Sequence, residues 1–415
     1  MQVSALGALI GLSLSIFLII RKNNPAYSLI LGALVGGITG GVSVQGTVNL
    51  MIGGAQGITP AVIRILTAGV LAGVLIESGA AAKIAETIIE KLGEKKALFA
   101  LALSAMVLTA VGVFVDVAVI TVSPIALAIA KKLNISKMAI LLAMIGGGKS
   151  GNIISPNPNT ISAAQNFNVE LSSLMAANII PALFGLVATV FIARTLVNKG
   201  EKNTDEEIEA VKDLPSFFTA IIGPIVTIML LALRPTLGIA IDPLIALPFG
   251  GIVGCIAMGK VKNLKKYMEY GLSKMIGVAV LLIGTGTVAG IISNSTLKDV
   301  MLALLEKSGL PLFILAPASG ILMSAATAST TAGATVASAT FAGTIMAAGI
   351  NGLYGAAMIH AGATVLDHLP HGSFFHATAG STSTKFEERF KLIPYESAIG
   401  FVLALVSTII YGVIL

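Results

Sequence analysis

The chain has 415 residues, of which 55% are hydrophobic and only 11% are charged, and its mean hydropathy is +0.94. A soluble domain carries about 25% charged residues, so a soluble protein of this composition could not cover its surface with polar groups. The composition therefore predicts an integral membrane protein. The net charge of +6 fits basic loops between apolar segments better than binding to nucleic acid.

The first apolar segment, residues 4–20, is followed by Arg21-Lys22-Asn23-Asn24-Pro25 and at once by a second apolar segment. It lacks a basic leader and a small-residue cleavage site, so we interpret it as a retained helix rather than a signal peptide. The basic pair Arg21-Lys22 and the basic run 260–266 predict that these loops are cytoplasmic and that the N-terminus is outside.

A transmembrane helix needs about 20 mostly apolar residues. Segments of roughly this kind lie at 4–20, 26–43, 58–78, 97–115, 176–196, 217–234, 243–259, 276–293, 310–326 and 395–414. We therefore expect an all-α, multi-pass protein of the cell (inner) membrane, in contact with the lipid bilayer, with about 10–12 transmembrane helices.

Two amphipathic segments, 80–94 and 295–308, carry charges at helical spacing and are too polar to span. We expect 80–94 to lie at the membrane interface. A polar linker at 197–214, which contains Thr204-Asp205-Glu206-Glu207, divides the chain into a first transmembrane repeat (1–196) and a second one (215–415).

The two halves resemble each other at matched positions. Ala72-Gly73-Val74-Leu75-Ile76 resembles Ala289-Gly290-Ile291-Ile292, and Glu90-Lys91-Leu92-Gly93 resembles Glu306-Lys307-Ser308-Gly309. The matched positions lie about 214–217 residues apart, although Ala/Gly/Ile-rich segments also resemble one another by chance. Repeats with matching breaks in their helices are typical of transporters whose site lies near the midplane of the membrane.

Each half contains an apolar segment interrupted by polar and helix-breaking residues, at 116–165 and at 327–380. An unpaired backbone group in hydrocarbon costs several kcal/mol, so broken helices occur only where protein or a wet cavity surrounds them. Helix ends at such a cavity present free N–H groups that suit a carboxylate. The predicted substrate-binding residues are the polar side chains of these breaks: Asn152, Ser155, Asn157, Asn159, Thr160, Ser329, Thr330, Thr331, His371 and Ser373.

Two ionisable residues stand alone in these segments. Asp116 lies in an apolar run, where an acid usually faces a cavity or a partner; it could also only cap a broken helix. Lys149 follows Gly146-Gly147-Gly148, where we expect a break in the helix. It could pair with an anionic substrate, or it could mark a mouth of the pathway.

All four histidines lie between 360 and 376, and His368 and His371 flank a proline beside Asp367. Three interpretations remain open: a proton-handling cluster, since histidine titrates near neutral pH, a structural role, and a metal site. The spacing of His368 and His371 does not match a helical pair of ligands, so we predict no metal site. The predicted proton-coupling residues are Asp116, Lys149, Asp367 and His368.

No nucleophile-and-base spacing of a known enzyme class is present, so we do not expect an enzyme. The single cysteine, Cys255, excludes a disulfide framework and a cysteine metal site. We expect no cofactor other than a coupling ion, which would be a proton or Na⁺.

The segment Val113-Phe114-Val115-Asp116-Val117 with Ser123-Pro124 resembles the equivalent stretch of the gluconate permease family. Ser155-Pro156-Asn157-Pro158-Asn159 resembles the proline-rich loop of that family. Leu366-Asp367-His368-Leu369-Pro370-His371-Gly372 resembles a segment of its hydroxybutyrate or citrate permease branch. The resemblance covers residues 5–414. The asparagines at 157 and 159 differ from the gluconate-type loop, which argues against gluconate itself.

The resemblance implies a secondary transporter that couples protons to symport of a small organic anion, such as gluconate, hydroxybutyrate or citrate, by alternating access. It also implies two inverted repeats with re-entrant helical hairpins, and a homodimer. By this resemblance the turns at Asn157 and at Asp367–His371 would be the hairpins, and Asp116 and Ser329–Thr331 would be the helix breaks. The alternative is a cation/proton antiporter of related architecture, in which Asp116 and Asp367 bind the cation.

Overall fold

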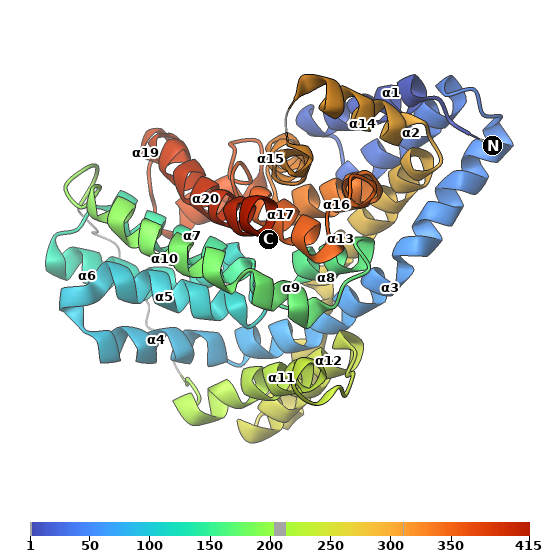
Figure 1. Ribbon diagram of the computed structural model, residues 1–415. Helices are drawn as coiled ribbons and strands as arrows, with labels where there is room; N and C mark the ends of the chain where they lie inside the picture. The colour runs from blue at the N-terminus through green and yellow to red at the C-terminus, as the bar shows by residue number, and fades with distance from the viewer. Residues whose placement is uncertain (1, 203–212, 310) are drawn as a thin grey trace.

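The computed structural model describes residues 2–202, 213–309 and 311–415, so part of the predicted polar linker lies outside the described residues. Within the described ranges every regular element is helical, and extended pairing is limited to an isolated bridge between Val3 and Ser295. The prediction of an all-α fold is confirmed (Figure 1).

The helices of the two halves follow one another in the same order. The first half contains α1 (Ala5–Ile20), α2 (Pro25–Thr39), α3 (Val44–Glu77), α4 (Ala80–Leu92), α5 (Ala97–Ala110), α6 (Val115–Leu133), α7 (Lys137–Asn152), α8 (Pro158–Asn166), α9 (Leu171–Ala177) and α10 (Ile179–Arg194). The second half contains α11 (Phe217–Leu237), α12 (Pro243–Ala257), α13 (Leu264–Ser293), α14 (Leu297–Ser308), α15 (Leu315–Thr327), α16 (Thr330–Ala347), α17 (Gly352–Gly362), α18 (Ser373–Ser381), α19 (Phe386–Lys391) and α20 (Ile393–Thr408).

Corresponding elements keep the spacing that the sequence suggests. α7 begins at Lys137 and α17 at Gly352, 215 positions later, and the same interval separates Pro158, which begins α8, from Ser373, which begins α18. Contacts between the two halves occur at matching positions as well. Ser123 Oγ of α6 lies 3.0 Å from Ser381 Oγ of α18, and the counterparts of these residues, Ser338 of α16 and Asn166 of α8, are 2.9 Å apart. The two halves are therefore interleaved at their centre.

The long helices α3 and α13 pack along each other and form the spine of the molecule. Glycines permit this close approach: a Cβ on Gly54 would lie 2.1 Å from the carbonyl oxygen of Gly286, and one on Gly73 would lie 2.0 Å from that of Tyr267. Both helices begin earlier than the predicted spans 58–78 and 276–293. The early turn of α3 is rich in Gly, Gln and Thr, and burial against α13 holds it in the helix without high hydropathy.

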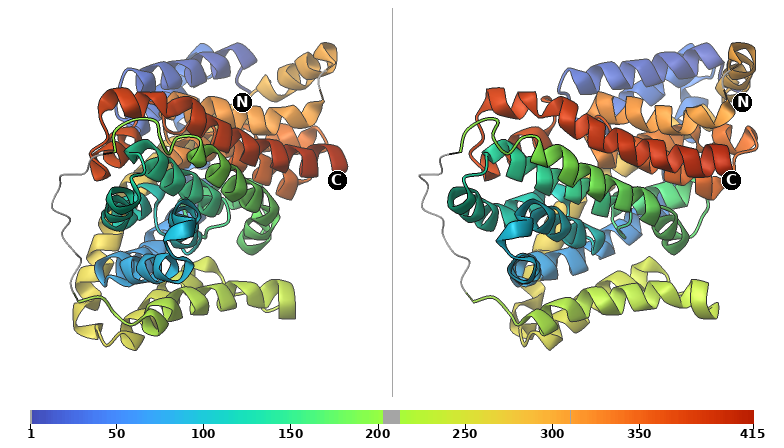
Figure 2. Two further views of the ribbon diagram at one scale, coloured as in Figure 1. Left: turned by 90° about the vertical axis from the view of Figure 1, so that its left-hand side faces the viewer. Right: turned by 60° about the vertical axis from the view of Figure 1, so that its left-hand side comes forward.

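Two helical pairs flank this spine. The pair α1–α2 lies on one flank of the molecule and the pair α11–α12 lies on the opposite flank, as Figures 1 and 2 show. Each packs on the spine through small residues: Gly284 of α13 meets Ala26 of α2, and Gly251 of α12 meets Leu71 of α3. The helices from α4 to α10 and from α15 to α20 lie between the flanks, and α14 packs beside α1 at the edge of the molecule.

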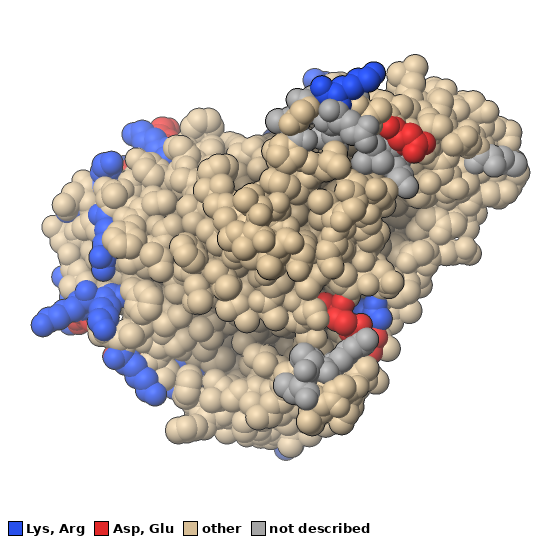
Figure 3. All heavy atoms as spheres, viewed as in Figure 1, with Lys and Arg blue, Asp and Glu red and all other residues tan. Residues whose placement is uncertain are grey.

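The surface fits a lipid environment. Large hydrophobic side chains such as Phe191, Phe218 and Phe401 are more than half exposed, and Figure 3 shows a wide area without charged side chains, with basic residues gathered at one edge. Among the described residues, three helical segments are long and apolar enough to cross a membrane, namely Val44–Glu77, Val261–Ser293 and Phe386–Ile414, and a bent pair formed by α9 and α10 is a fourth. Shorter apolar helices supplement them, so the count of 10–12 spans stays a prediction.

The two amphipathic segments are helical, as predicted. Residues 80–92 form α4, whose apolar side, including Ile84 and Ile89, is buried, while Lys83 pairs with Glu86 at 2.8 Å on its more exposed side. Residues 297–308 form α14. α4 packs mainly on α5, so the helix lies against the protein along its apolar face.

Neighbouring glycines of α3 test the role of the spine contact. Gly54→Ala should lower the melting temperature of the detergent-solubilised protein by several degrees, because the new methyl group has no space beside α13. Gly53→Ala is the control: nothing lies within 4 Å of its Cβ position, so alanine should leave stability unchanged or raise it slightly. Equal effects of the two substitutions would contradict close packing at Gly54.

Candidate functional site

Four interruptions between helices meet at the centre of the molecule. They lie at residues 111–114 between α5 and α6, at 153–157 between α7 and α8, at 328–329 between α15 and α16, and at 363–372 between α17 and α18. Gly112 and Ala328 adopt positive φ angles of 105° and 46° there, a conformation that favours glycine and is strained for alanine. The polar, broken character predicted for these regions is confirmed.

The first predicted break differs in detail. α7 runs unbroken through Gly146-Gly147-Gly148 and Lys149 and ends at Asn152. The glycines serve packing instead of ending the helix: a Cβ on Gly147 would lie 1.9 Å from the carbonyl oxygen of Ala102 in α5. The break begins five residues later than the glycine-rich stretch suggested, at Ile153.

The hairpins also lie elsewhere than the resemblance implied. α15 and α16 fold back on each other, since a Cβ on Gly333 would lie 2.6 Å from the Cα of Ser324 across the tip at Ala328–Ser329. In contrast, α7 packs on α5 and α10, whereas α8 packs on α16 and α3. The hairpin tip is therefore at Ala328–Ser329, just before Thr330 and Thr331 in the first turn of α16, and the turns around Asn157 and Asp367–His371 are interruptions of broken helices.

A cavity of about 380 Å³ lies where the four interruptions meet. The N-terminal turns of α6, α8, α16 and α18 all reach its wall, as does the C-terminal end of α7. Eight of the predicted site residues line this central cavity: Asp116, Asn152, Asn159, Ser329, Thr330, Thr331, Asp367 and Ser373. Residues from both halves of the chain, far apart in sequence, thus form one site.

The predicted asparagines form a rigid network at the end of α7. Asn157 donates to the side-chain oxygen of Asn152 at 2.6 Å, and Asn159 donates to the same oxygen at 3.2 Å. Asn157 also caps α8 by accepting from the backbone N–H of Thr160 at 3.1 Å. Asn157 and Thr160 therefore shape the turn without lining the cavity. Ser155 is buried in the break and does not line the cavity either.

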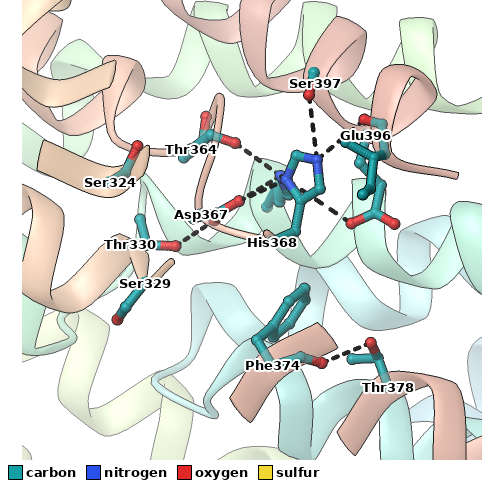
Figure 4. Close-up of polar contacts among 12 residues, drawn as sticks. Ser324, Ser329, Thr330, Thr364, Asp367, His368, Phe374, Thr378, Glu396 and Ser397 are labelled. Carbon is teal, nitrogen blue, oxygen red and sulfur yellow. Dashed lines mark hydrogen bonds and ion pairs between the residues drawn. The ribbon is translucent and has the colours of Figure 1, made fainter. Parts of the chain in front are cut away.

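Asn152 has a charged counterpart in the second half. Asp367 lies 215 positions later, at the equivalent interruption, and its carboxylate accepts hydrogen bonds on both oxygens. Lys149 Nζ donates to Oδ1 at 2.6 Å, and Thr330 donates to Oδ2. Figure 4 shows Thr330 pointing at Asp367 from the neighbouring hairpin. The ion pair is buried, because the side chains of Lys149 and Asp367 are 1% and 5% exposed, and it joins the two halves at the site.

Lys149 satisfies all three of its protons inside the protein. Besides Asp367, its Nζ donates to the carbonyl oxygen of Thr364 at 2.7 Å and lies 2.8 Å from Nδ1 of His368. The same Nδ1 lies 3.1 Å from Oδ1 of Asp367, so the imidazole ring contacts both members of the ion pair. On its other side, Nε2 lies 3.0 Å from the carbonyl oxygen of Ile393. Lys149 and His368 stand behind Asp367 and do not line the central cavity.

A second buried ion pair continues this network, and sequence reasoning missed it. Arg389 of α19 contacts Glu396 of α20, and both side chains are fully buried. Glu396 Oε2 lies 3.9 Å from His368 Nδ1, and the guanidinium group of Arg389 covers the ring of Phe375. An Arg–Glu pair seven positions apart near the end of an apolar chain resembles a surface pair, so only the packing of α18 to α20 shows its burial.

Asp116 differs from Asp367 because it has no cationic partner. It lies in the first turn of α6 and accepts from the N–H of Val117 at 2.9 Å, and no Lys or Arg in the described ranges lies within ion-pair distance of it. Lys274 of α13 lines the same cavity but was missed, because it falls just outside the predicted span 276–293. The cavity therefore offers one free carboxylate, one lysine and several neutral hydroxyl and amide groups.

The remaining histidines are dispersed. His371 lines an adjoining space next to the central cavity, and its Nε2 lies 3.3 Å from the carbonyl oxygen of Ala326. His376 contacts the carbonyl oxygen of Pro370, and His360 is buried in α17. Among the described residues, no three His, Cys, Asp or Glu side chains gather so as to hold a metal ion.

Comparison with known proteins agrees with this architecture. The model of the family described as GntP family permease matches residues 3–414. The chain belongs to this family. The permease resembles an uncharacterized transporter of Haemophilus influenzae, at 63% identity over 413 residues and 99% of each chain. It is also 21% identical to a high-affinity gluconate transporter of Escherichia coli, over 90% of this chain and 92% of the relative.

A solved structure supports the fold. The YdaH transporter of Alcanivorax borkumensis, described as having an unusual topology, superposes with a TM-score of 0.68 over 96% of this permease and 98% of that chain, at 16% identity. The family and the apolar helices confirm a multi-pass protein of the inner membrane. The assignment to the gluconate permease family, made from sequence motifs, is confirmed.

The buried Lys149–Asp367 pair generates a testable prediction. Lys149→Met or Asp367→Asn alone leaves one buried charge without its partner, which should cost roughly 3–5 kcal/mol of unfolding free energy. The double variant removes both charges and should cost clearly less than the sum of the two single variants. Unfolding of the solubilised protein in a double-mutant cycle measures this coupling; strictly additive costs would show that the two groups do not interact.

Proposed function

We propose that this permease is a proton-coupled symporter of a small organic anion, a hydroxy acid or sugar acid such as gluconate, hydroxybutyrate or citrate, and that it works by alternating access. The observation that carries the proposal is the convergence of four helix N-termini, those of α6, α8, α16 and α18, on one cavity. Each N-terminus carries unpaired N–H groups and a positive dipole end, which together favour a carboxylate.

Two of these N-termini lack a side-chain cap in the described structure. α6 begins after Phe114 and α18 after Gly372, and neither residue caps its helix through a side chain. The amide groups of these first turns can therefore bind a substrate carboxylate, while Ser329, Thr331 and Asn159 offer neutral groups to hydroxyls. A cavity of about 380 Å³ is at the small end of the range for organic ligands.

Asp116 is the residue that we propose to carry the coupling proton. Its carboxylate lines the cavity without a cationic partner, whereas that of Asp367 is already neutralised by Lys149. A negative Asp116 repels a substrate anion across the same cavity, and protonation removes that repulsion. Anion and proton would therefore bind together. Lys149 and His368 would position Asp367 rather than exchange the proton.

The matched order of the helices supports the two repeats, and the opposed placement of the α1–α2 and α11–α12 flanks fits an inverted relation between them. We include inverted repeats and a homodimer in the proposal. The antiporter alternative needs two free carboxylates for a cation, and the pairing of Asp367 with Lys149 argues against it.

Uptake of radiolabelled gluconate, 3-hydroxybutyrate and citrate into proteoliposomes tests the proposal. Accumulation of at least one acid should require an inward proton gradient. Asp116→Asn should abolish gradient-driven accumulation while retaining exchange of the same acid across the membrane, because the asparagine variant stays permanently neutral at that position.

Asp299→Asn in α14, outside the site, serves as the control and should behave as the parent protein. Accumulation that follows a sodium gradient when the proton gradient is collapsed would contradict proton coupling. A proton flux driven by sodium with no organic acid present would favour the antiporter instead.

A further inference from the structure

The tips of the two flanking helical pairs differ in what they contact. The tip of α1–α2, residues 19–26, lines a space of about 580 Å³ together with α13, the tip of the α15–α16 hairpin and the start of α18. Five residues line both this space and the central cavity: Gly277, Leu281, Ala328, Ser329 and Ser373. The central cavity therefore adjoins the space beside α1–α2, and these five residues belong to the walls of both.

The tip of α11–α12 lines a separate cavity of about 390 Å³, beside the far half of α8 and the loop that follows it. Among the described residues, none lines both this cavity and the central one. The equivalent space on this flank is thus cut off from the site.

Arg64 of α3 spans this second cavity. Its Nε and Nη2 donate to the carboxylate of Asp242, at 3.0 and 2.7 Å, and its Nη1 donates to the side-chain oxygen of Gln165 at 2.6 Å. Asp242 also caps α12 by accepting from the N–H of Leu244, and Gln165 belongs to α8. A single guanidinium group therefore ties the spine, the α11–α12 flank and a helix of the site together.

The opposite flank has no such tie at the corresponding place. The helices α2 and α12 begin with Pro25 and Pro243, capped by Asn24 and Asp242. The counterpart of Arg64 on α13 is Leu281, 217 positions later by the match of Gly73 with Gly290, and Leu281 lines the α1–α2 space and has no hydrogen-bonding side chain. The two halves have corresponding helices, and only the α11–α12 flank has this polar contact among the described residues.

We propose that Arg64 and Gln165 form a latch that holds the α11–α12 flank of the central cavity closed. Asp242 anchors Arg64 to α12, and α8 carries Gln165 at one end and the cavity residue Asn159 near the other. Movement of the site relative to α3 and α12 must break the bond between Arg64 and Gln165. The latch rests on the proposed alternating access, and it positions helices without touching substrate.

The latch distinguishes two conformations, one closed and one open on the α11–α12 flank. A contact that exists in only one conformation favours that conformation by its full differential free energy. Removing the latch therefore shifts the population towards a state that is open on the α11–α12 flank, and strengthening it does the opposite. The hydrogen bond to a charged donor is strong enough to shift the ratio of the two states by about tenfold.

Two substitutions of one residue test the latch in opposite directions. Gln165→Leu removes the acceptor, and Gln165→Glu supplies a charged acceptor for Arg64 at the same position. The other acids at this cavity, Glu170 and Asp242, remain in both variants. Gln56→Leu, an exposed glutamine of α3 away from the latch, is the control for the change of side chain.

The readout is chemical access to the cavity from each face of the membrane. The buried cysteine is removed by Cys255→Ala, and Thr331→Cys places a reporter thiol in the wall of the cavity. A membrane-impermeant thiol reagent is applied to oriented proteoliposomes without substrate, in separate experiments on each face of the membrane. Gln165→Leu should raise labelling from the face at which the tip of α11–α12 lies at least about tenfold, and Gln165→Glu should lower labelling from that face.

Unchanged labelling in both variants, or a change of the same sign in both, would overturn the latch. Loss of folding in one variant cannot imitate opposite changes, and the remaining variant still tests the proposal alone. Because labelling needs neither an organic acid nor a proton gradient, it separates the latch from the proposed function. Shifted labelling without uptake of any acid would sustain the latch and reject the anion proposal.

Discussion

The backbone of this permease must find partners wherever it leaves a helix inside the membrane, because an unpaired peptide group costs several kcal/mol in hydrocarbon. The chain meets this constraint by gathering its four interruptions at one place, where they face each other and a cavity instead of lipid. The same arrangement exposes helix N-termini to the cavity. The requirement that allows the helices to break thus creates the site at which we propose that an anion binds.

The two acidic residues of this site occupy different positions in the two halves. Asn152 and Asp367 occupy equivalent places, and so do Asp116 and Thr331, each pair 215 positions apart. One carboxylate is locked by Lys149 in a buried network that reaches His368 and Glu396, and the other remains free at the cavity. Two related halves therefore carry different chemistry: one acid is buried and paired with a lysine, and the other lines the cavity without a cationic partner.

The sequence predicted much of this because breaks and repeats are local features. The polar interruptions, the spacing of the halves and eight of the site residues could be read from short segments. The course of α7 through Gly146–Gly148 could not, because those glycines are determined by contact with α5. Likewise Lys274 lies beside a predicted span, and the burial of Arg389 and Glu396 depends on how α18, α19 and α20 pack together.

The polar contact at Arg64 makes the two flanks of the molecule unequal. The central cavity adjoins the space beside α1–α2, while Arg64 ties the opposite flank through Asp242 and Gln165. Under the proposed alternating access this contact must break in each cycle, and a partly exposed pair suits that role: the side chains of Arg64 and Asp242 are 28% and 40% exposed. A much stronger contact would hold the permease in one of its two conformations.

The central claim is that a carboxylate binds where the helix N-termini converge. An experimental structure of the permease with a transported acid, or with a brominated analogue whose bromine can be located by anomalous scattering, tests this claim most directly. The account predicts the carboxylate within hydrogen-bond distance of first-turn amides of α6, α16 or α18, close to Asp116. An acid bound outside the central cavity, with the helix N-termini unoccupied, would contradict it.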